Sequence, residues 1–458
     1  MAVLVAVVLV AGLLTAVTRE GERTAAGVAS PPTTEPQPGE RGPGTSVPPS
    51  VTTVPREAPR LPNVAPEQRR ALEVLMDQVS AVRGLEWKEP LNLRIVGRTE
   101  MVRRLRAANA RDTNPAQVAA EEAMLKLLDL IPDSLNYAKL RDDLLGGVVL
   151  GFYDPETKEL YVAVSDVNNL DASEKSTIVH EMVHALTDQH FGYGPKTIEL
   201  DKADKAEEAM ALRALLEGDA RLTELRWMER HLTEIEALAV ILGVGVEAGD
   251  GVDVLSRTPA YIREALYFPY DKGMDFVERL YNSGGFAAVN AAYRRLPAST
   301  EQILRPEAYS AGENALPPPL PDVAGASGCR RVRTGSLGEF DTRALLNRHI
   351  DVATSERAAR GWNGDAYALV RCGSVLGFVN RWEADRSTDA AELAEALGRW
   401  AAVWSGGQGT VSGGRFAGPS GAGHINRRGN RVDLVLAQDT ATADRLARAL
   451  GAPVSPAA

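Results

Sequence analysis

The clearest chemical pattern in this chain is a His-Glu-x-x-His motif at residues 180–184. Residues four apart lie on one face of an α-helix, so His180 and His184 can place two imidazole nitrogens on one Zn2+ ion per chain. Zinc lowers the pKa of a bound water to about 7, and an adjacent carboxylate can accept its proton and later deliver it to a leaving amine. The motif therefore predicts a catalytic metal site with Glu181 as the general base.

A catalytic zinc site needs a third protein ligand, and the sequence offers two candidates. Glu217 follows two leucines in a long helical stretch, and the neighbouring Gly218 would let another backbone approach closely. His190 lies six residues after His184, a spacing used by three-histidine sites, but Thr187 occupies the position at which those sites turn on a glycine. We expect Glu217 to be the ligand, with His190 as the alternative.

The motif needs a helix and neighbouring elements to hold it in place. Asp171, with Glu174 three residues later, has the spacing of a capping box and predicts the start of the motif helix. Residues 204–242 predict a further helical stretch, which carries Glu217. Residues 148–164 contain two β-prone runs and predict a hairpin that leads into the motif helix.

The composition is that of a globular protein with two folded units. Of 458 residues, 44% are hydrophobic and 24% are charged, and the net charge of -10 argues against a nucleic-acid partner. Between residues 259 and 309 we expect helices, with interruptions at 268–270 and 284–285. We predict an α+β fold with a signal peptide or signal anchor at 1–18, a disordered Pro/Thr-rich linker at 19–62, a mainly helical domain with a small sheet at 63–312, and a smaller α+β domain at 325–452.

An apolar N-terminal segment and a pair of cysteines indicate an exported protein. Residues 2–17 form an uncharged apolar run, which is typical of a signal peptide or a short membrane anchor. Cys329 and Cys372 are the two cysteines of the chain, and a pair of cysteines in an exported chain predicts one disulfide. We therefore expect the protein to lie outside the cytoplasm, either secreted or held at the membrane by a single N-terminal anchor.

The motif and its surroundings resemble the gluzincins, the metallopeptidases whose type example is thermolysin. The resemblance rests on the segment His180-Glu-Met-Val-His184-Ala-Leu-Thr-Asp188 and on Glu217 in a second helix. It implies a zincin-like domain with zinc held by His180, His184 and Glu217, Glu181 as catalytic base, and Asp188 as a carboxylate that orients one histidine. The resemblance also implies a peptide or protein substrate. The 33 residues from His184 to Glu217 exceed the spacing in thermolysin, so details of the substrate pocket do not transfer.

Three other segments are similar to uncharacterised exported proteins of actinobacterial type. They are FPYDKG at 268–273, PASTEQILRPEAY at 297–309 and GWNGD at 361–365. The similarity extends over about residues 65–450 and suggests that the C-terminal domain belongs with the catalytic unit. Trp362 and Asp365 are expected to be packing and turn residues.

Peptidases of this kind also use a Tyr or His donor to stabilise the oxyanion of the reaction. Tyr261, Tyr267, Tyr270 and His231 all follow the ligand helix, and the sequence does not distinguish among them. The strand at 151–153 precedes the motif helix, as the edge strand that aligns the substrate does in gluzincins, so an extended peptide could pair with it.

The sequence thus predicts an exported zinc metallopeptidase that hydrolyses peptide bonds with a metal-activated water. One alternative is a metzincin-like hydrolase in which His190 replaces Glu217 as the third ligand. The other is a non-catalytic protein of the cell envelope that binds zinc for structural reasons and serves as a binding or scaffold module. The intact Glu181 argues against the second alternative, because a structural zinc site does not need a carboxylate beside the metal.

Overall fold

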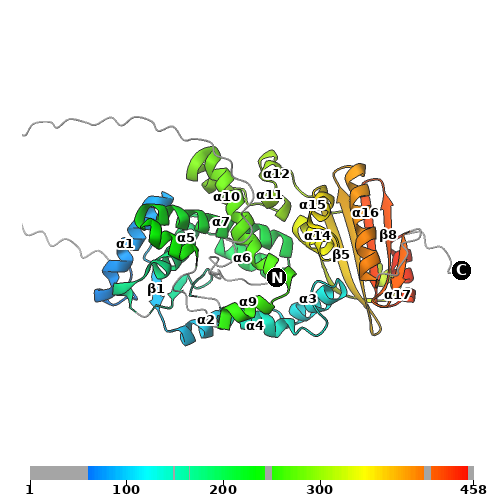
Figure 1. The fold of residues 1–458 in the computed structure, drawn as a ribbon, viewed down its shortest axis with the longest axis horizontal. Helices are drawn as coiled ribbons and strands as arrows, with labels where there is room; N and C mark the ends of the chain where they lie inside the picture. The colour runs from blue at the N-terminus through cyan, green and yellow to red at the C-terminus, as the bar shows by residue number, and fades with distance from the viewer. Residues whose placement is uncertain (1–59, 148–149, 165, 243–249, 407–413, 452–458) are drawn as a thin grey trace, which may run out of the picture.

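A computed structural model describes residues 60–147, 150–164, 166–242, 250–406 and 414–451. The expected signal segment at 1–18 and nearly all of the expected linker at 19–62 lie outside these ranges. In the part that is described, no helix is long and apolar enough to cross a membrane. The fold is α+β, as predicted, with a mainly helical N-terminal part at one end and a six-stranded sheet at the other (Figure 1).

The N-terminal part consists of many helices and one small sheet. Its helices are α1 (Pro66–Arg83), α2 (Arg98–Asp112), α3 (Pro115–Leu127), α4 (Tyr137–Gly147), α5 (Ala172–Phe191), α6 (Gly194–Lys202), α7 (Ala206–His231), α8 (Glu234–Ile241), α9 (Asp250–Arg257), α10 (Ala260–Arg294), α11 (Thr300–Leu304) and α12 (Pro306–Ala311). Its strands β1 (Asn92–Ile95), β2 (Gly151–Asp154) and β3 (Glu159–Val162) form a sheet in the order β1-β3-β2. β3 pairs in parallel with β1 and antiparallel with β2, so β2 is an edge strand. β2 also contacts α5, the helix that carries the motif.

Helix α5 begins where the sequence predicts. The Asp171 side chain accepts a hydrogen bond of 2.8 Å from the Glu174 backbone N–H, and the Glu174 carboxylate accepts one of 3.0 Å from the Asp171 backbone N–H. This reciprocal pair is a capping box, which satisfies two N–H groups that have no partner within the helix. The helix ends at Phe191 and is followed by Gly192, whose φ of 62° is in the left-handed region that glycine adopts without strain. The predicted hairpin is also present, as β2 and β3.

Of the two interruptions predicted for residues 259–309, helix α10 shows the one at 284–285 and lacks the one at 268–270. Residues 268–270 continue the helix, so the expected break there is wrong. Proline costs about 3 kcal/mol in a helix interior, but Phe268, Pro269 and Tyr270 are all buried, and their packing offsets that cost. The predicted break at Gly284 and Gly285 is confirmed by non-helical dihedral angles at both residues.

The C-terminal part is an antiparallel sheet covered by helices on both faces. Its elements are α13 (Val323–Ser327), β4 (Arg330–Gly335), α14 (Gly338–Asn347), α15 (Val352–Ala359), β5 (Trp362–Cys372), β6 (Val375–Ala384), α16 (Ser387–Trp404), β7 (Arg415–Gly418), β8 (Gly421–Arg428), β9 (Arg431–Ala437) and α17 (Thr440–Ala449). The strand order is β4-β5-β6-β9-β8-β7. Alternate residues of β5 point to opposite faces, so Leu369 packs in the core that includes Trp400 of α16, whereas Val370 packs with Leu446 of α17.

The two parts share one hydrophobic core. Leu127 at the end of α3 and Trp404 at the end of α16 belong to the same buried cluster, and the Trp404 indole N–H donates a 3.0 Å hydrogen bond to the Leu127 carbonyl oxygen. Arg333 of β4 forms two hydrogen bonds of 2.8 and 2.6 Å with the Asp204 carboxylate, just before α7. The C-terminal sheet is therefore packed directly against the helical part.

The segments PASTEQILRPEAY and GWNGD lie at or near this junction. Thr300 donates backbone and side-chain hydrogen bonds of 2.6 and 2.9 Å to the Glu207 carboxylate in the first turn of α7, and its hydroxyl accepts one from the Phe340 backbone N–H. The buried Asp365 carboxylate accepts hydrogen bonds from the backbone N–H groups that begin α14 and from the Trp362 indole. These residues therefore have the structural roles of a junction and a helix cap.

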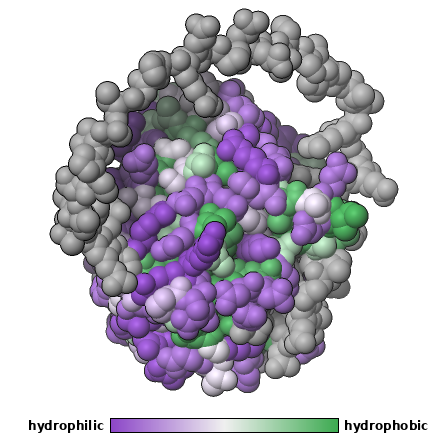
Figure 2. Space-filling view, turned by 90° about the vertical axis from the view of Figure 1, so that its left-hand side faces the viewer, coloured by the Kyte–Doolittle hydropathy of each residue, from purple (hydrophilic) through white to green (hydrophobic). Residues whose placement is uncertain are grey.

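The face at the α1 end of the molecule is mainly hydrophilic, with small separate hydrophobic patches (Figure 2). Among the described residues, the large apolar side chains that are most exposed include a short run on and just after α8, namely Ile235, Leu238, Ile241 and Leu242.

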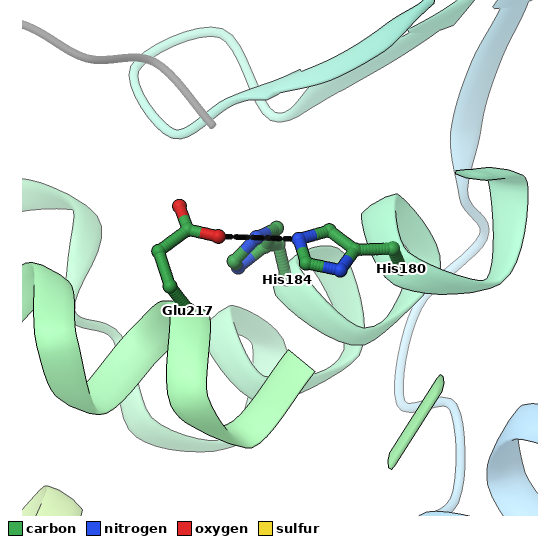
Figure 3. A group of neighbouring side chains, drawn as sticks. All are labelled: His180, His184 and Glu217. Atoms are coloured by element: carbon green, nitrogen blue, oxygen red, sulfur yellow. Dashed lines mark hydrogen bonds and ion pairs between the residues drawn. The ribbon is translucent and has the colours of Figure 1, made fainter. Parts of the chain in front are cut away.

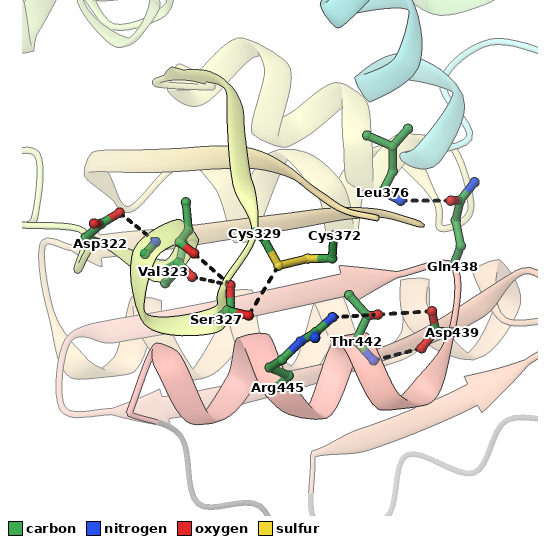
Figure 4. Close-up of a disulfide and its surroundings, with 12 residues drawn as sticks. Asp322, Val323, Ser327, Cys329, Cys372, Leu376, Gln438, Asp439, Thr442 and Arg445 are labelled. Atoms are coloured by element: carbon green, nitrogen blue, oxygen red, sulfur yellow. Dashed lines mark hydrogen bonds between the residues drawn. A yellow bond between two sulfur atoms is a disulfide. The ribbon is translucent and has the colours of Figure 1, made fainter. Parts of the chain in front are cut away.

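The predicted disulfide is present between Cys329 and Cys372 (Figure 4). Their Cα atoms lie 4.4 Å apart, and the bond joins the start of β4 to the end of β5 across a sequence separation of 43 residues. A crosslink stabilises a fold chiefly by reducing the conformational entropy of the unfolded chain, and this effect grows with loop length.

Replacing both cysteines by serine is expected to lower the free energy of unfolding of the C-terminal part by about 4 kcal/mol, the value of the chain-entropy model for a loop of this size. Urea unfolding of the oxidised parent and the double variant would measure the difference. The reduced parent should match the double variant, and equal unfolding midpoints for all three forms would contradict the expectation.

Candidate metal centre

Three side chains from two helices of the N-terminal part point toward one another (Figure 3). His180 and His184 project from α5, and Glu217 projects from α7, which packs against it. The His180 Nε2 atom lies 3.2 Å from His184 Nε2 and 3.1 Å from Glu217 Oε2, and His184 Nε2 lies 3.4 Å from the same oxygen. All three residues are buried, so this group is a candidate ligand set rather than a surface cluster.

The geometry of the three atoms fits a zinc ion. With Zn–N and Zn–O bonds of about 2.0–2.1 Å at tetrahedral angles, two ligand atoms lie about 3.3 Å apart. The three observed separations are 3.1, 3.2 and 3.4 Å. Two histidines and one carboxylate are also a donor set typical of catalytic zinc sites, which leave a further position for water.

Glu224 is a partner of the site that sequence reasoning missed. Its Oε2 atom lies 3.2 Å from His180 Nδ1, and this contact leaves Nε2 turned toward Glu217 and His184. Ser176 donates a 2.5 Å hydrogen bond to Glu224 Oε1, and Arg221 donates one of 3.0 Å to Oε2. Glu224 follows Glu217 by seven residues, or about two helical turns, and this spacing on one helix face was the available signal.

The charges around the cluster favour a bound cation. Burial lowers the pKa of His180, but its hydrogen bonds to Glu217 and Glu224 outweigh burial and raise this pKa to about 10. Burial raises the pKa of Glu217, but the charges and hydrogen bonds of the two imidazoles lower it to about 2. Burial also raises the pKa of Glu224, but the Arg221 charge and the contact with His180 outweigh burial and lower this pKa to about 2. The negative charges of these two buried carboxylates, Glu217 and Glu224, would therefore stabilise a positive charge at the cluster.

Glu181 lies beside the three candidate ligands without being one of them. Its side chain is fully buried, and neither carboxylate oxygen has a hydrogen-bond partner among the residues that the structure describes. Burial raises the pKa of this carboxyl group to about 7, although the imidazoles of His184 and His180 act in the opposite direction. A buried carboxylate without a partner is costly, so Glu181 is suited to hold a water molecule or a substrate group at the site.

The approach of α10 to α7 behind Glu217 depends on two glycines. A Cβ atom on Gly218 would lie 2.2 Å from the Gly273 carbonyl oxygen, and one on Gly273 would lie 2.1 Å from the Ala214 carbonyl oxygen. Gly273 belongs to the FPYDKG segment, and the same segment places Tyr270 near His180, with ring centroids 6.3 Å apart. The predicted role of Gly218, a close backbone contact, is therefore present.

Gly273→Ala is expected to lower the free energy of unfolding by about 1–3 kcal/mol, because the added methyl group must push α10 away from α7. Gly398→Ala is the matched control, since this glycine lies within α16 and a Cβ there would meet no atom within 4 Å. That change should instead stabilise the protein by about 0.5–1 kcal/mol. Urea unfolding measures both, and shifts of the same sign would contradict the steric explanation.

His190 and Asp188 have other partners than those considered from the sequence. Helix α5 continues to Phe191, and His190 Nε2 bonds to the Glu86 carbonyl oxygen at 2.7 Å, so the structure does not bring His190 to the cluster. The Asp188 carboxylate accepts hydrogen bonds from the Tyr153 hydroxyl and from Lys158 rather than from a histidine. Glu224 is the carboxylate that contacts His180, because the Nδ1 atom of this histidine points toward α7.

Of the four candidates for an oxyanion donor, Tyr270 lies beside the cluster, next to His180. The Tyr261 hydroxyl donates to Asp341 of the C-terminal part at 3.0 Å. His231 is exposed at the end of α7 and packs beside Trp227.

Comparison with known proteins identifies one segment of this chain. Residues 327–447, less than half of the chain, match a family described as a domain of unknown function (DUF8575). This segment coincides with the six-stranded sheet and its helices and excludes the metal centre. No curated protein and no solved structure matches the chain.

Proposed function

We propose that this protein is a zinc metallopeptidase of the gluzincin type, with a zincin-like N-terminal part. The observation that carries the proposal is the convergence of His180, His184 and Glu217 on one point, with the buried and unpartnered carboxylate of Glu181 beside it. Structural zinc sites are closed by four protein ligands, whereas the cluster found among the described residues contains three. A site with one position left for water supports hydrolysis over a structural role.

In this proposal His180, His184 and Glu217 hold one Zn2+ ion. When bound there, zinc would lower the pKa of a water molecule to about 7 and polarise the substrate carbonyl group. Glu181 would accept the proton of the attacking water and deliver it to the leaving amine nitrogen. Glu224 would keep the His180 ring in the orientation that turns Nε2 toward the ligand cluster.

Two neighbouring features support a peptide substrate. β2 is an edge strand beside α5, and an extended peptide can pair with such an edge. Tyr270 is the candidate of the four that lies next to the ligand His180, and its hydroxyl would serve as the oxyanion donor. The disulfide supports the proposal that the protein works outside the cytoplasm, because disulfides persist in oxidising compartments.

The test is the zinc content of the purified full chain by elemental analysis. We expect about one zinc per chain in the parent and in His190→Ala, and loss of zinc in His180→Ala and in Glu217→Ala. His190→Ala is the matched control, because it removes an imidazole from the same helix away from the cluster. Loss of zinc with His190→Ala alone would favour the metzincin-like alternative. A parent without zinc would return the protein to the envelope binding or scaffold alternative.

A further inference from the structure

Strand β2 contacts helix α5 at two points that lie on the same face of the strand. Gly151 and Tyr153 are two residues apart, so both face α5. A Cβ atom on Gly151 would lie 3.1 Å from Glu181 Cγ and 3.3 Å from Thr177 Cγ2, so the strand backbone lies directly over the general base. Tyr153 extends along the helix, and its hydroxyl donates a 2.8 Å hydrogen bond to Asp188 Oδ2.

Asp188 joins three segments at the second contact. Its buried carboxylate accepts hydrogen bonds from Tyr153, from Lys158 in the turn between β2 and β3, and from the Gly194 backbone N–H, at 3.1 Å, at the start of α6. Lys158 has a φ of 58°, a left-handed conformation that is uncommon for a residue with a side chain. The turn is therefore held in an unfavourable backbone conformation that brings its ammonium group to Asp188.

The two contacts together fix the strand. Glu181 and Asp188 are seven residues apart on α5, which is about 10.5 Å along the helix axis. A strand attached at two points this far apart can neither tilt nor slide along the helix without breaking one of them. The opposite face of the strand is anchored separately, where Phe152 stacks on Tyr161 of β3 with ring centroids 4.9 Å apart.

We propose that Gly151, Tyr153 and Asp188 are positioning residues that fix the edge of β2 over Glu181, so that a substrate pairing with this edge presents its peptide bond to that carboxylate. The inference rests on the proposed peptidase function and adds the residues that would position its substrate. Recognition through a strand edge uses backbone hydrogen bonds, so the substrate is an extended segment of polypeptide, and its side chains contribute less.

The test compares two probes on the zinc-loaded full chain. Acetohydroxamate chelates zinc and needs no strand, whereas a library of blocked dipeptide hydroxamates adds a backbone that can pair with β2. Tyr153→Phe removes only the hydroxyl that bonds Asp188. Tyr161→Phe is the matched control, because it removes a phenol hydroxyl from the opposite face of the same sheet, where it contacts Glu159 and Arg104.

We expect Tyr153→Phe to weaken the tightest dipeptide hydroxamate about tenfold and to leave acetohydroxamate affinity, zinc content and melting temperature close to the parent values. Lys158→Met, at a half-exposed side chain, is a second variant that disturbs the same carboxylate with little risk to folding. It should weaken the same probe by a smaller factor. Tyr161→Phe should change neither affinity.

Equal affinity of the parent and Tyr153→Phe for the dipeptide hydroxamate would overturn the inference and leave the proposed function standing. A library in which no member binds more tightly than acetohydroxamate would do the same, because β2 would then contribute nothing to binding. A parent that binds neither zinc nor acetohydroxamate would overturn both the proposed function and the inference.

Discussion

Replacing Glu181 by glutamine is expected to lower kcat for peptide hydrolysis by about 100- to 10,000-fold, the usual contribution of a general base. The amide has nearly the shape of the carboxylate but cannot accept a proton. Glu181 is not one of the three converging ligands, so zinc should stay bound. The measurement is kcat on a fluorogenic peptide chosen from a library, together with elemental zinc analysis of the same preparation.

Glu229→Gln is the matched control for this experiment. It makes the same chemical change at an exposed position of α7, the helix that carries Glu217, and should leave kcat within about twofold of the parent. A Glu181→Gln variant with zinc and with the kcat of the parent would exclude the base role. Loss of zinc from that variant would show instead that Glu181 supports the metal.

Replacing Asp219 by asparagine should destabilise the fold by about 3–5 kcal/mol, because it leaves a buried arginine without its counter-ion. Arg83 of α1 donates hydrogen bonds of 2.8 and 2.9 Å to the Asp219 carboxylate, and both side chains have no solvent exposure. Tyr293 of α10 donates a further one of 2.8 Å to the same carboxylate. Asp219 lies two residues after Glu217 and joins α7 to α1 and α10, so the substitution weakens the contact among these three helices. Urea unfolding would measure the decrease in the free energy of unfolding.

Asp77→Asn is the control for the buried pair. Asp77 forms an ion pair of 2.6 Å with Arg60, and the two side chains are 68% and 41% exposed. Exposed pairs contribute about 0–1 kcal/mol, so this variant should unfold close to the parent. If both aspartate variants unfolded at the same urea concentration, burial would not explain the importance of Asp219.

The C-terminal domain is attached to α7, the helix that carries Glu217, through a short series of contacts. Glu207 in the first turn of α7 binds Thr300, and Thr300 in turn binds the Phe340 backbone at the start of α14. Arg333 and Asp204 add an ion pair next to these contacts. Because the DUF8575 segment supplies Phe340 and Arg333, this domain supports the N-terminus of the helix that presents Glu217.

Features that depend on local chain geometry were predictable from the sequence. The four-residue spacing of His180 and His184 fixes them on one face of a helix, and the capping box at Asp171 fixes where that helix begins. The pairing of Cys329 with Cys372 likewise followed from their being the two cysteines of an exported chain. Glu217 was expected as the third member of the cluster from its place beside Gly218 in a helical stretch and from the gluzincin resemblance, and the structure shows that it converges on the histidines.

Features that depend on contacts between distant segments were decided only by the tertiary structure. The sequence could not assign Glu224 rather than Asp188 to His180, because the choice depends on which way the imidazole of α5 faces α7. It also could not show that Pro269 stays within α10, since the packing that offsets its cost comes from neighbouring helices. Spacing along a chain determines which side chains share a face, whereas the identity of the partner opposite that face depends on how helices far apart in sequence pack together.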